Sequence, residues 1–155
     1  MGHTLAKQMV SDFAGIAPGK VKVAIDCYKK PYLPLHPDIH FNLSYSDAYI
    51  ACAVSDVPVG VDIEVMKPRS MKIAHRFFTP YELAYITAIE AEKLVRFYEI
   101  WTKKESAIKM WGTGFLTSIS SFDVLKQSSI GYTRISSNFE LMCHVCIGRQ
   151  IRFNF

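Results

Sequence analysis

The stretch VGVDIEV at residues 59–65 constrains the fold most, because apolar and acidic residues alternate in it. In a strand, successive side chains point to opposite faces. The four β-branched residues of the stretch would then share one face, and Asp62 and Glu64 would share the other. Two neighbouring carboxylates repel each other unless water or a cation screens them. The pattern therefore predicts either a solvated strand face or a bound metal ion.

The composition is that of one folded domain. The chain has 155 residues, of which half are hydrophobic and 13% are aromatic, so it can form a packed core. No run approaches the ~18 uninterrupted apolar residues of a membrane helix, and the first 15 residues contain no apolar stretch typical of a signal peptide. We therefore expect a cytoplasmic protein with no membrane partner.

The four cysteines are expected to be free thiols. Two of them form the motif CHVC at residues 143–146, which resembles half of a zinc site but has no second pair to complete four ligands. If this motif lies in a strand, a separation of three places Cys143 and Cys146 on opposite faces. Structural, reduced cysteines fit a cytoplasmic location.

The net charge of +4 is mildly basic, and the lysines and arginines are scattered along the chain. Such a distribution can attract a polyanionic small molecule or an acidic protein partner. Because no motif interleaves aromatic and basic residues, we do not expect nucleic-acid binding.

The remaining pattern favours an α+β fold, in which a small antiparallel sheet packs against a long helix. The clearest helix spans residues 92–111 and ends at the GTG that follows. Thr79, Pro80 and Glu82 form a capping box that opens another helix, and Ser70 is a predicted N-cap. A further helix is expected at residues 4–14. Strands are predicted at residues 20–26, at 48–55 paired in a hairpin with 59–65, and in several antiparallel segments within 119–155.

One charge in the long helix lies on the wrong side. At ~100° per residue, Glu105 projects about 20° from Leu94, in the middle of an apolar stripe. A carboxylate there is unfavourable without a counter-charge. One interpretation is an ion pair with Lys109, four residues later, worth ~0.3–0.5 kcal/mol if exposed.

The other interpretation joins the helix to the acidic strand. If the helix packs on that end of the sheet, Asp62, Glu64 and Glu105 converge, and three carboxylates with room for water suit Mg²⁺. Lys109 beside them would then suit a phosphate group. The implied chemistry is metal-assisted phosphoryl-type transfer.

Five segments, in order and spacing, resemble the 4'-phosphopantetheinyl transferases, and most closely the Sfp-type branch. The signature pair is GVDIE at residues 60–64, followed about forty residues later by WTKKESAIK at 101–109. The other three segments are KKPYL at residues 29–33, FNLSYSD at 41–47 and KPRSMKIAHRFFTPYE at 67–82. The similarity covers roughly residues 5–125, and it implies one lobe of the transferase fold.

The resemblance implies an activity and roles for individual residues. The family moves the phosphopantetheine arm of coenzyme A onto a serine of an apo acyl or peptidyl carrier protein, with Mg²⁺ as cofactor. The implied metal ligands are Asp62, Glu64 and Glu105. The implied catalytic residues are Glu105 and Lys109. Glu105, or a water held by the metal, would take the serine proton, and Lys109 would hold the pyrophosphate. The implied coenzyme A contacts are Lys30, Ser44, Tyr45, Lys104 and Lys109.

The chain departs from the family pattern in two ways. Tyr45 replaces a histidine that is expected to help bind the 3'-phosphate of coenzyme A, and a phenol brings no positive charge. Sfp-type enzymes also have two similar lobes, whereas here we expect residues 1–40 to be a remnant of the first lobe and a loop, and 41–155 to be the metal-binding lobe. The chain is then a homo-oligomer that completes the cleft, a truncated product, or a degenerate homologue that binds carrier protein or nucleotide without transfer.

Overall fold

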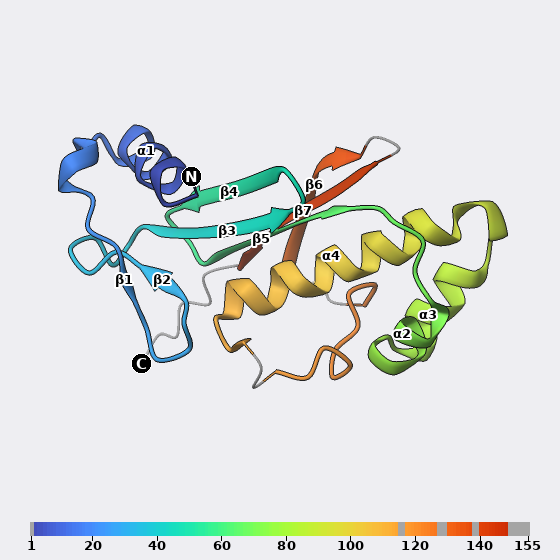
Figure 1. The fold of residues 1–155 in the computed structure, drawn as a ribbon. Coiled ribbons are helices and arrows are strands. Elements are labelled where there is room, and N and C mark those ends of the chain that lie inside the picture. Colours follow the sequence, from blue (N-terminus) through green and yellow to red (C-terminus); the bar gives the residue numbers. More distant parts are fainter. Residues whose placement is uncertain (1, 115–116, 127–129, 138–139, 149–155) are drawn as a thin grey trace, which may run out of the picture.

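A computed structural model describes residues 2–114, 117–126, 130–137 and 140–148 of the chain. Figure 1 shows its elements in chain order. The helices are α1 (Gly2–Ala14), η1 (Pro18–Lys20), α2 (Met71–Phe77), α3 (Pro80–Thr87), η2 (Glu90–Glu92) and α4 (Lys93–Trp111). The strands are β1 (Ala24–Ile25), β2 (Pro31–Tyr32), β3 (His40–Ser46), β4 (Tyr49–Ser55), β5 (Val59–Val65), β6 (Ile130–Ser137) and β7 (Leu141–Gly148).

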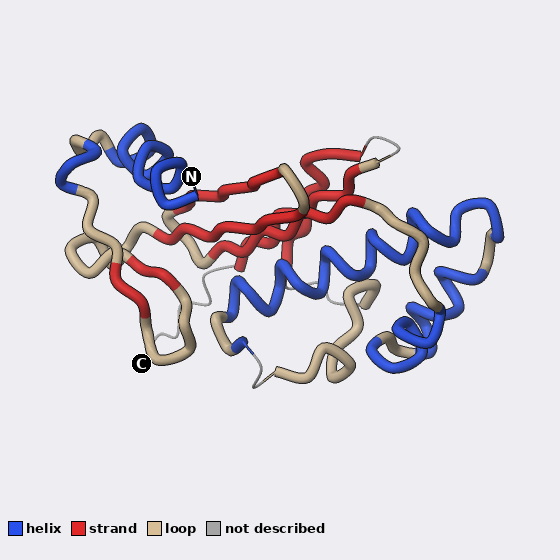
Figure 2. Tube along the Cα trace, viewed as in Figure 1, coloured by secondary structure: helices blue, strands red, loops and turns tan. Residues whose placement is uncertain are grey.

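The strands form three small antiparallel sheets, in the orders β1-β2, β3-β4 and β5-β7-β6. Helix α4 lies along β5 and β7, with α2 and α3 grouped near its N-terminal end and α1 on the far side of the strands (Figures 1 and 2). The predicted α+β fold, with a long helix against a small antiparallel sheet, is confirmed. In the described part of the chain, no helix is long and apolar enough to cross a membrane.

The predicted hairpin between residues 48–55 and 59–65 is wrong. Strand β4 pairs with β3, and β5 pairs instead with β7, about eighty residues later, with Asp62 opposite His144. The turn after β4 therefore carries the chain from one sheet to the next rather than back along the same sheet. A local turn signal cannot distinguish these two outcomes, because the partner of β5 is remote in sequence.

Two other predicted strands are also wrong. Residues 20–26 contain only the two-residue β1, preceded by η1, because alternation without a long neighbouring strand does not make a ladder. Residues 119–125 form turns and bends rather than a strand. The alternating segment at 151–155 lies outside the described residues.

The two predicted N-caps and the predicted end of the long helix are confirmed, whereas the helix expected at residues 4–14 begins earlier, at Gly2. The side chain of Ser70 caps α2, and Thr79 with Glu82 forms the complete capping box of α3. Gly112 ends α4 in the left-handed conformation, with φ of 71°, which favours glycine because it has no Cβ.

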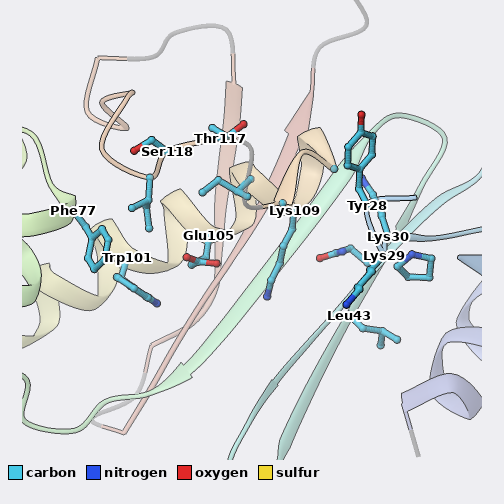
Figure 3. A pocket seen from close by; sticks show the side chains of 16 residues that line it. Tyr28, Lys29, Lys30, Leu43, Phe77, Trp101, Glu105, Lys109, Thr117 and Ser118 are labelled. Carbon is cyan, nitrogen blue, oxygen red and sulfur yellow. The ribbon is translucent and has the colours of Figure 1, made fainter. Parts of the chain in front are cut away.

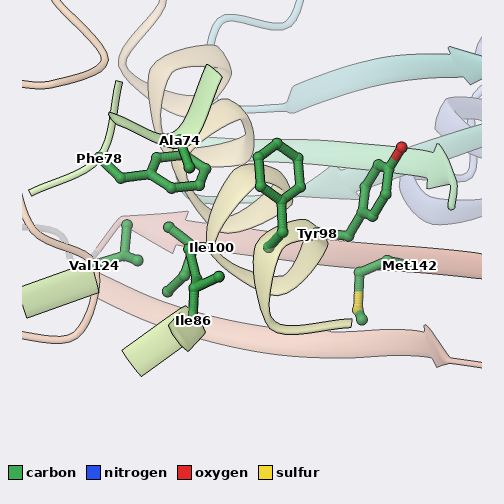
Figure 4. Packing of buried hydrophobic residues seen from close by; sticks show 8 residues of the cluster. Ala74, Phe78, Ile86, Tyr98, Ile100, Val124 and Met142 are labelled. Atoms are coloured by element: carbon green, nitrogen blue, oxygen red, sulfur yellow. The ribbon is translucent and has the colours of Figure 1, made fainter. Parts of the chain in front are cut away.

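The core lies on both faces of the β5-β7-β6 sheet. Val59, Val61 and Ile63 pack with Cys143 on one face, as the alternation predicts. On the other face, Cys146 packs against α4, so the two thiols of CHVC do point in opposite directions, and all four cysteines are free. Figure 4 shows the larger cluster between α4, its neighbouring helices and β7. Its buried members are Ala74, Phe78, Ile86, Phe97, Tyr98, Ile100, Val124 and Met142.

Candidate active site

The apolar stripe predicted on α4 divides between the core and a cavity. Phe97 and Tyr98 of the stripe are buried in the core, whereas Leu94 at its start is 37% exposed. Trp101, Glu105 and the residues that follow them on the stripe line a cavity of about 570 Å³ (Figure 3). Glu105 is therefore half-buried at a cavity wall, which resolves the anomaly of its position.

Five segments form this cavity. Helix α4 supplies one wall, the segment around β2 a second, β3 a third, the turns after α4 a fourth, and the end of α2 contributes Phe77. The lining residues are Tyr28, Lys29, Lys30, Pro31, Asn42, Leu43, Phe77, Trp101, Glu105, Ile108, Lys109, Gly112, Gly114, Thr117, Ser118 and Ile119. Two lysines from the β2 side thus face the same space as Glu105 and Lys109 (Figure 3).

Asp62 is paired with Lys109 beside this cavity. The Nζ of Lys109 lies 2.6 Å from Asp62 Oδ1 and 2.8 Å from the Ser44 hydroxyl, and that hydroxyl donates to the same carboxylate oxygen over 3.0 Å. Asp62 is only 4% exposed. The interpretation of a solvated face is therefore wrong for Asp62.

The second carboxylate oxygen of Asp62, Oδ2, is buried and lacks a hydrogen-bond donor among the described residues. Burial raises the pKa of this carboxyl to about 6; Lys109 opposes the shift, and Glu105 and Glu64 add to it. A buried carboxylate oxygen without a partner is costly, and a cation would satisfy it.

Glu105 and Glu64 belong to the same electrostatic group. Burial raises the pKa of Glu105, with Lys109 opposing and Glu64 adding to the shift. Lys109 of α4 forms its ion pair with Asp62 of β5 rather than the predicted i, i+4 pair with Glu105. The structure thus places the three predicted carboxylates near Lys109, close enough for their charges to interact.

A divalent cation fits this group chemically, although the site is not preformed. Among the residues that the structure describes, no three histidine, cysteine or acidic side chains are gathered closely enough to hold a metal ion. The fit rests on Asp62 Oδ2, which has no partner among the described residues, and on the nearby charges of Glu105 and Glu64, which add to the raised pKa of Asp62. Hard oxygen ligands of this kind suit Mg²⁺.

Lys104 is not at the cavity, which corrects its predicted role as a coenzyme A contact. It is fully buried, lies 3.0 Å from Glu82 in an ion pair, and donates to the main-chain oxygens of Ile119 and Phe122. Glu82 in turn accepts the N–H of Val124. The pair fastens the turns after α4, and Ile119 of that segment lines the cavity.

The other predicted contacts differ in how they are placed. Lys30 lines the cavity and donates to the carbonyl of Met110, and burial lowers its pKa. Ser44 is buried between Asp62 and Lys109 and is not a lining residue. Tyr45 is 57% exposed and points toward α1, where its hydroxyl approaches Gly2 so closely that a Cβ would not fit. The structure therefore does not bring Tyr45 to the cavity.

Sequence reasoning missed several lining residues. Asn42 lies in the FNLSYSD segment, and its alternation with Ser44 was the signal that could have placed it on the β5 side of β3. Phe77 and Trp101 pack on the core cluster, yet they also form the apolar end of the cavity. Ile119 carried no signal, because buried contacts of Lys104 position it.

Comparison with known proteins shows which family the chain belongs to. Residues 58–152, more than half of the chain, match the model of the 4'-phosphopantetheinyl transferase superfamily. The chain belongs to this superfamily. The match includes both the acidic strand β5 and all of α4, so the residues of the carboxylate and lysine group lie within it.

Curated members of the transferase superfamily are similar over most of this chain. A 4'-phosphopantetheinyl transferase of Bacillus subtilis is 39% identical over 125 residues, which is 80% of this chain and 56% of that protein. The transferase Sfp of Bacillus subtilis strain 168 is 36% identical over the same share of each chain. The transferase gsp of Aneurinibacillus migulanus is 34% identical over 83% of this chain and 54% of its own length. The chain thus spans about half the length of the curated relatives that it matches.

Proposed function

We propose that this chain transfers the 4'-phosphopantetheine arm of coenzyme A to a serine of an apo acyl or peptidyl carrier protein, with Mg²⁺ as cofactor. The observation that carries the proposal is the ion pair of the buried Asp62 with Lys109, beside a cavity that Glu105 lines. One oxygen of Asp62 has no hydrogen-bond partner among the described residues. The names of the relatives support the same reaction. We expect the protein to act in the cytoplasm, where free thiols stay reduced.

In this proposal the residues of the cavity divide into two roles. Lys29, Lys30 and Lys109 supply positive charge for the phosphates of coenzyme A. Asp62, Glu64 and Glu105 would hold Mg²⁺, which, when bound, neutralises charge on the pyrophosphate as its bond breaks. Lys109 needs only to turn its ammonium from Asp62 to a phosphate oxygen, because it already lines the cavity.

The bond changes follow from these positions. Glu105 accepts the proton of the carrier serine, and its pKa, raised by burial, makes it a better base than an exposed glutamate. The serine oxygen then forms a bond to the β-phosphorus of coenzyme A, and the bond from that phosphorus to the bridging oxygen breaks. The leaving group is 3',5'-ADP, whose charge the lysines stabilise.

The test is to incubate the chain with coenzyme A, Mg²⁺ and a panel of apo carrier proteins, and to measure carrier mass. We expect one carrier to gain the mass of the phosphopantetheine arm, and Glu105→Gln to abolish the gain. Carrier binding without any mass gain would overturn the proposal in favour of a homologue that binds without transfer. Sedimentation of the same sample tests the predicted self-association, and a monomer at high concentration would contradict it.

A further inference from the structure

Strand β3 lies beside β5 without forming a backbone ladder with it. The two strands belong to different sheets, and β5 is at the edge of its own. The edge N–H groups of β5 nevertheless have partners, because every second side chain of β3 reaches across to accept them. The N–H of Val61 donates to Asn42 over 3.0 Å, that of Ile63 to Ser44 over 3.2 Å, and that of Val65 to Ser46 over 2.9 Å.

The two serines of this row make a second bond that the asparagine does not. The Ser44 hydroxyl donates to Asp62 over 3.0 Å, and the Ser46 hydroxyl donates to Glu64 over 3.1 Å. A hydroxyl has one hydrogen and two lone pairs. Because each serine accepts a backbone N–H of β5, its single hydrogen remains for the carboxylate. Ser44 uses its second lone pair for Lys109, so its bonding capacity is full.

The row therefore links each carboxylate to the backbone of its own strand. Ser44 donates to Asp62 and accepts the N–H of the residue that follows Asp62 in β5. Ser46 donates to Glu64 and accepts the N–H of the residue that follows Glu64. Docking of the strand alone would not need this arrangement, since Asn42 accepts its N–H without contacting an acid.

We propose that Ser44 and Ser46 are positioning residues, which fix the carboxylates of Asp62 and Glu64 for a divalent cation, whereas Asn42 bonds β5 without holding either carboxylate. The inference rests on the proposed function for the identity of that cation. It assigns the two serines of FNLSYSD to the placement of carboxylates.

The test compares Mn²⁺ affinity of the full chain by electron paramagnetic resonance in Ser46→Ala, Ser46→Thr and Asn42→Ala. Loss of a group that orients a metal ligand typically weakens affinity about 10–100-fold, which is the result expected for Ser46→Ala. Thr keeps the hydroxyl and should restore binding. Asn42→Ala loses the same kind of backbone bond but no bond to a carboxylate, so its Mn²⁺ affinity should fall far less than that of Ser46→Ala. Unchanged affinity in Ser46→Ala, or an equal loss in Asn42→Ala, would overturn the proposal.

A second readout works without metal. The χ1 couplings of Glu64, measured by nuclear magnetic resonance, should report one rotamer in the unaltered chain and several in Ser46→Ala. Identical couplings in both would overturn the positioning role. If the unaltered chain binds no Mn²⁺ although the couplings change as expected, the proposed metal chemistry fails while the positioning of Glu64 stands.

Discussion

Two lysines of α4, five residues apart, form ion pairs of opposite character. Lys104 and Glu82 are both fully buried, and backbone groups from the turns after α4 satisfy the remaining bonds of the pair. Lys109 is partly exposed, with 28% of its side chain accessible, and one buried oxygen of its partner Asp62 has no hydrogen bond from the part of the chain that the structure describes. The first pair is closed, and the second is open toward a cavity.

The difference shows which lysine has capacity left for chemistry. A fully bonded buried pair cannot exchange a partner without leaving a charge unpaired, which is strongly unfavourable. In the open pair, Asp62 Oδ2 accepts no hydrogen bond from the described residues, and Lys109 lines the cavity in which an anion would bind. We infer that Lys104 fixes a wall of the cavity and Lys109 acts within it.

The largest effect should come from opening the closed pair. Lys104→Ala leaves Glu82 charged and buried, and removal of one partner of such a pair costs about 3–5 kcal/mol in the free energy of unfolding. Urea denaturation measures this loss. The double variant Lys104→Met with Glu82→Gln keeps the hydrogen-bond acceptor and removes both charges, so it should recover much of the stability. A loss below ~1 kcal/mol for Lys104→Ala would show that the pair behaves as a solvated one.

Substitution of Glu105, which lines the cavity beside the Asp62–Lys109 pair, should lower the rate of transfer without a comparable loss of stability. Glu105→Gln removes the proposed base, and such a change lowers the transfer rate by about 10²–10⁴-fold. Its melting temperature should stay near that of the unaltered chain, because Gln fills the same half-buried position without a charge to desolvate. A rate that is unchanged at saturating coenzyme A would exclude Glu105 as the base.

The stability of the chain should depend on pH through Asp62 of the open pair. Burial raises the pKa of Asp62 from 3.8 to about 6 in the folded state, so the folded chain holds this proton more tightly than the unfolded chain does. The resulting stabilisation is present below pH 3.8 and is lost as the pH rises through 6. In metal-free buffer, the stability of the unaltered chain relative to Asp62→Asn should fall by on the order of 2–3 kcal/mol across this window. A difference that stays constant with pH would contradict the raised pKa.

The smallest effect is expected at a surface ion pair, which serves as a reference for both lysines of α4. Lys67 and Asp47 lie 2.7 Å apart, with more than half of each side chain exposed. Lys67→Ala should change the free energy of unfolding by about 0.2–1 kcal/mol, and added salt should reduce the difference. A larger, salt-independent loss would mean that close approach alone, rather than burial, determines the strength of these pairs.

Local patterns were enough to predict much of this fold. The capping box at Thr79, the span of α4 and the two faces of β5 depend on nearest neighbours along the chain, and all three are confirmed. The pairing of β5 with β7 and the side-chain row from β3 depend on segments that meet only after folding. No periodicity in the sequence carries that information.

The candidate site divides in the same way. The anomalous position of Glu105 predicted either an ion pair or a group of converging carboxylates, and the structure places this residue at a cavity wall. Nothing in the sequence KKES distinguished Lys104 from its neighbours, since the groups that bury it come from α3 and from the turns after α4. Tyr45 alternates with Ser44, and the direction of that alternation became visible only with β5 in place.

The most direct test of this account is phosphopantetheine transfer by Lys109→Met, measured by carrier mass at a temperature where the variant is folded. We predict a lower melting temperature, because the buried Asp62 loses its counter-charge, and a transfer rate at least about 100-fold lower in the folded variant, because an interaction with the reacting phosphates is worth several kcal/mol. Transfer at the unaltered rate, with the fold intact, would contradict the claim that the open pair is the chemical one.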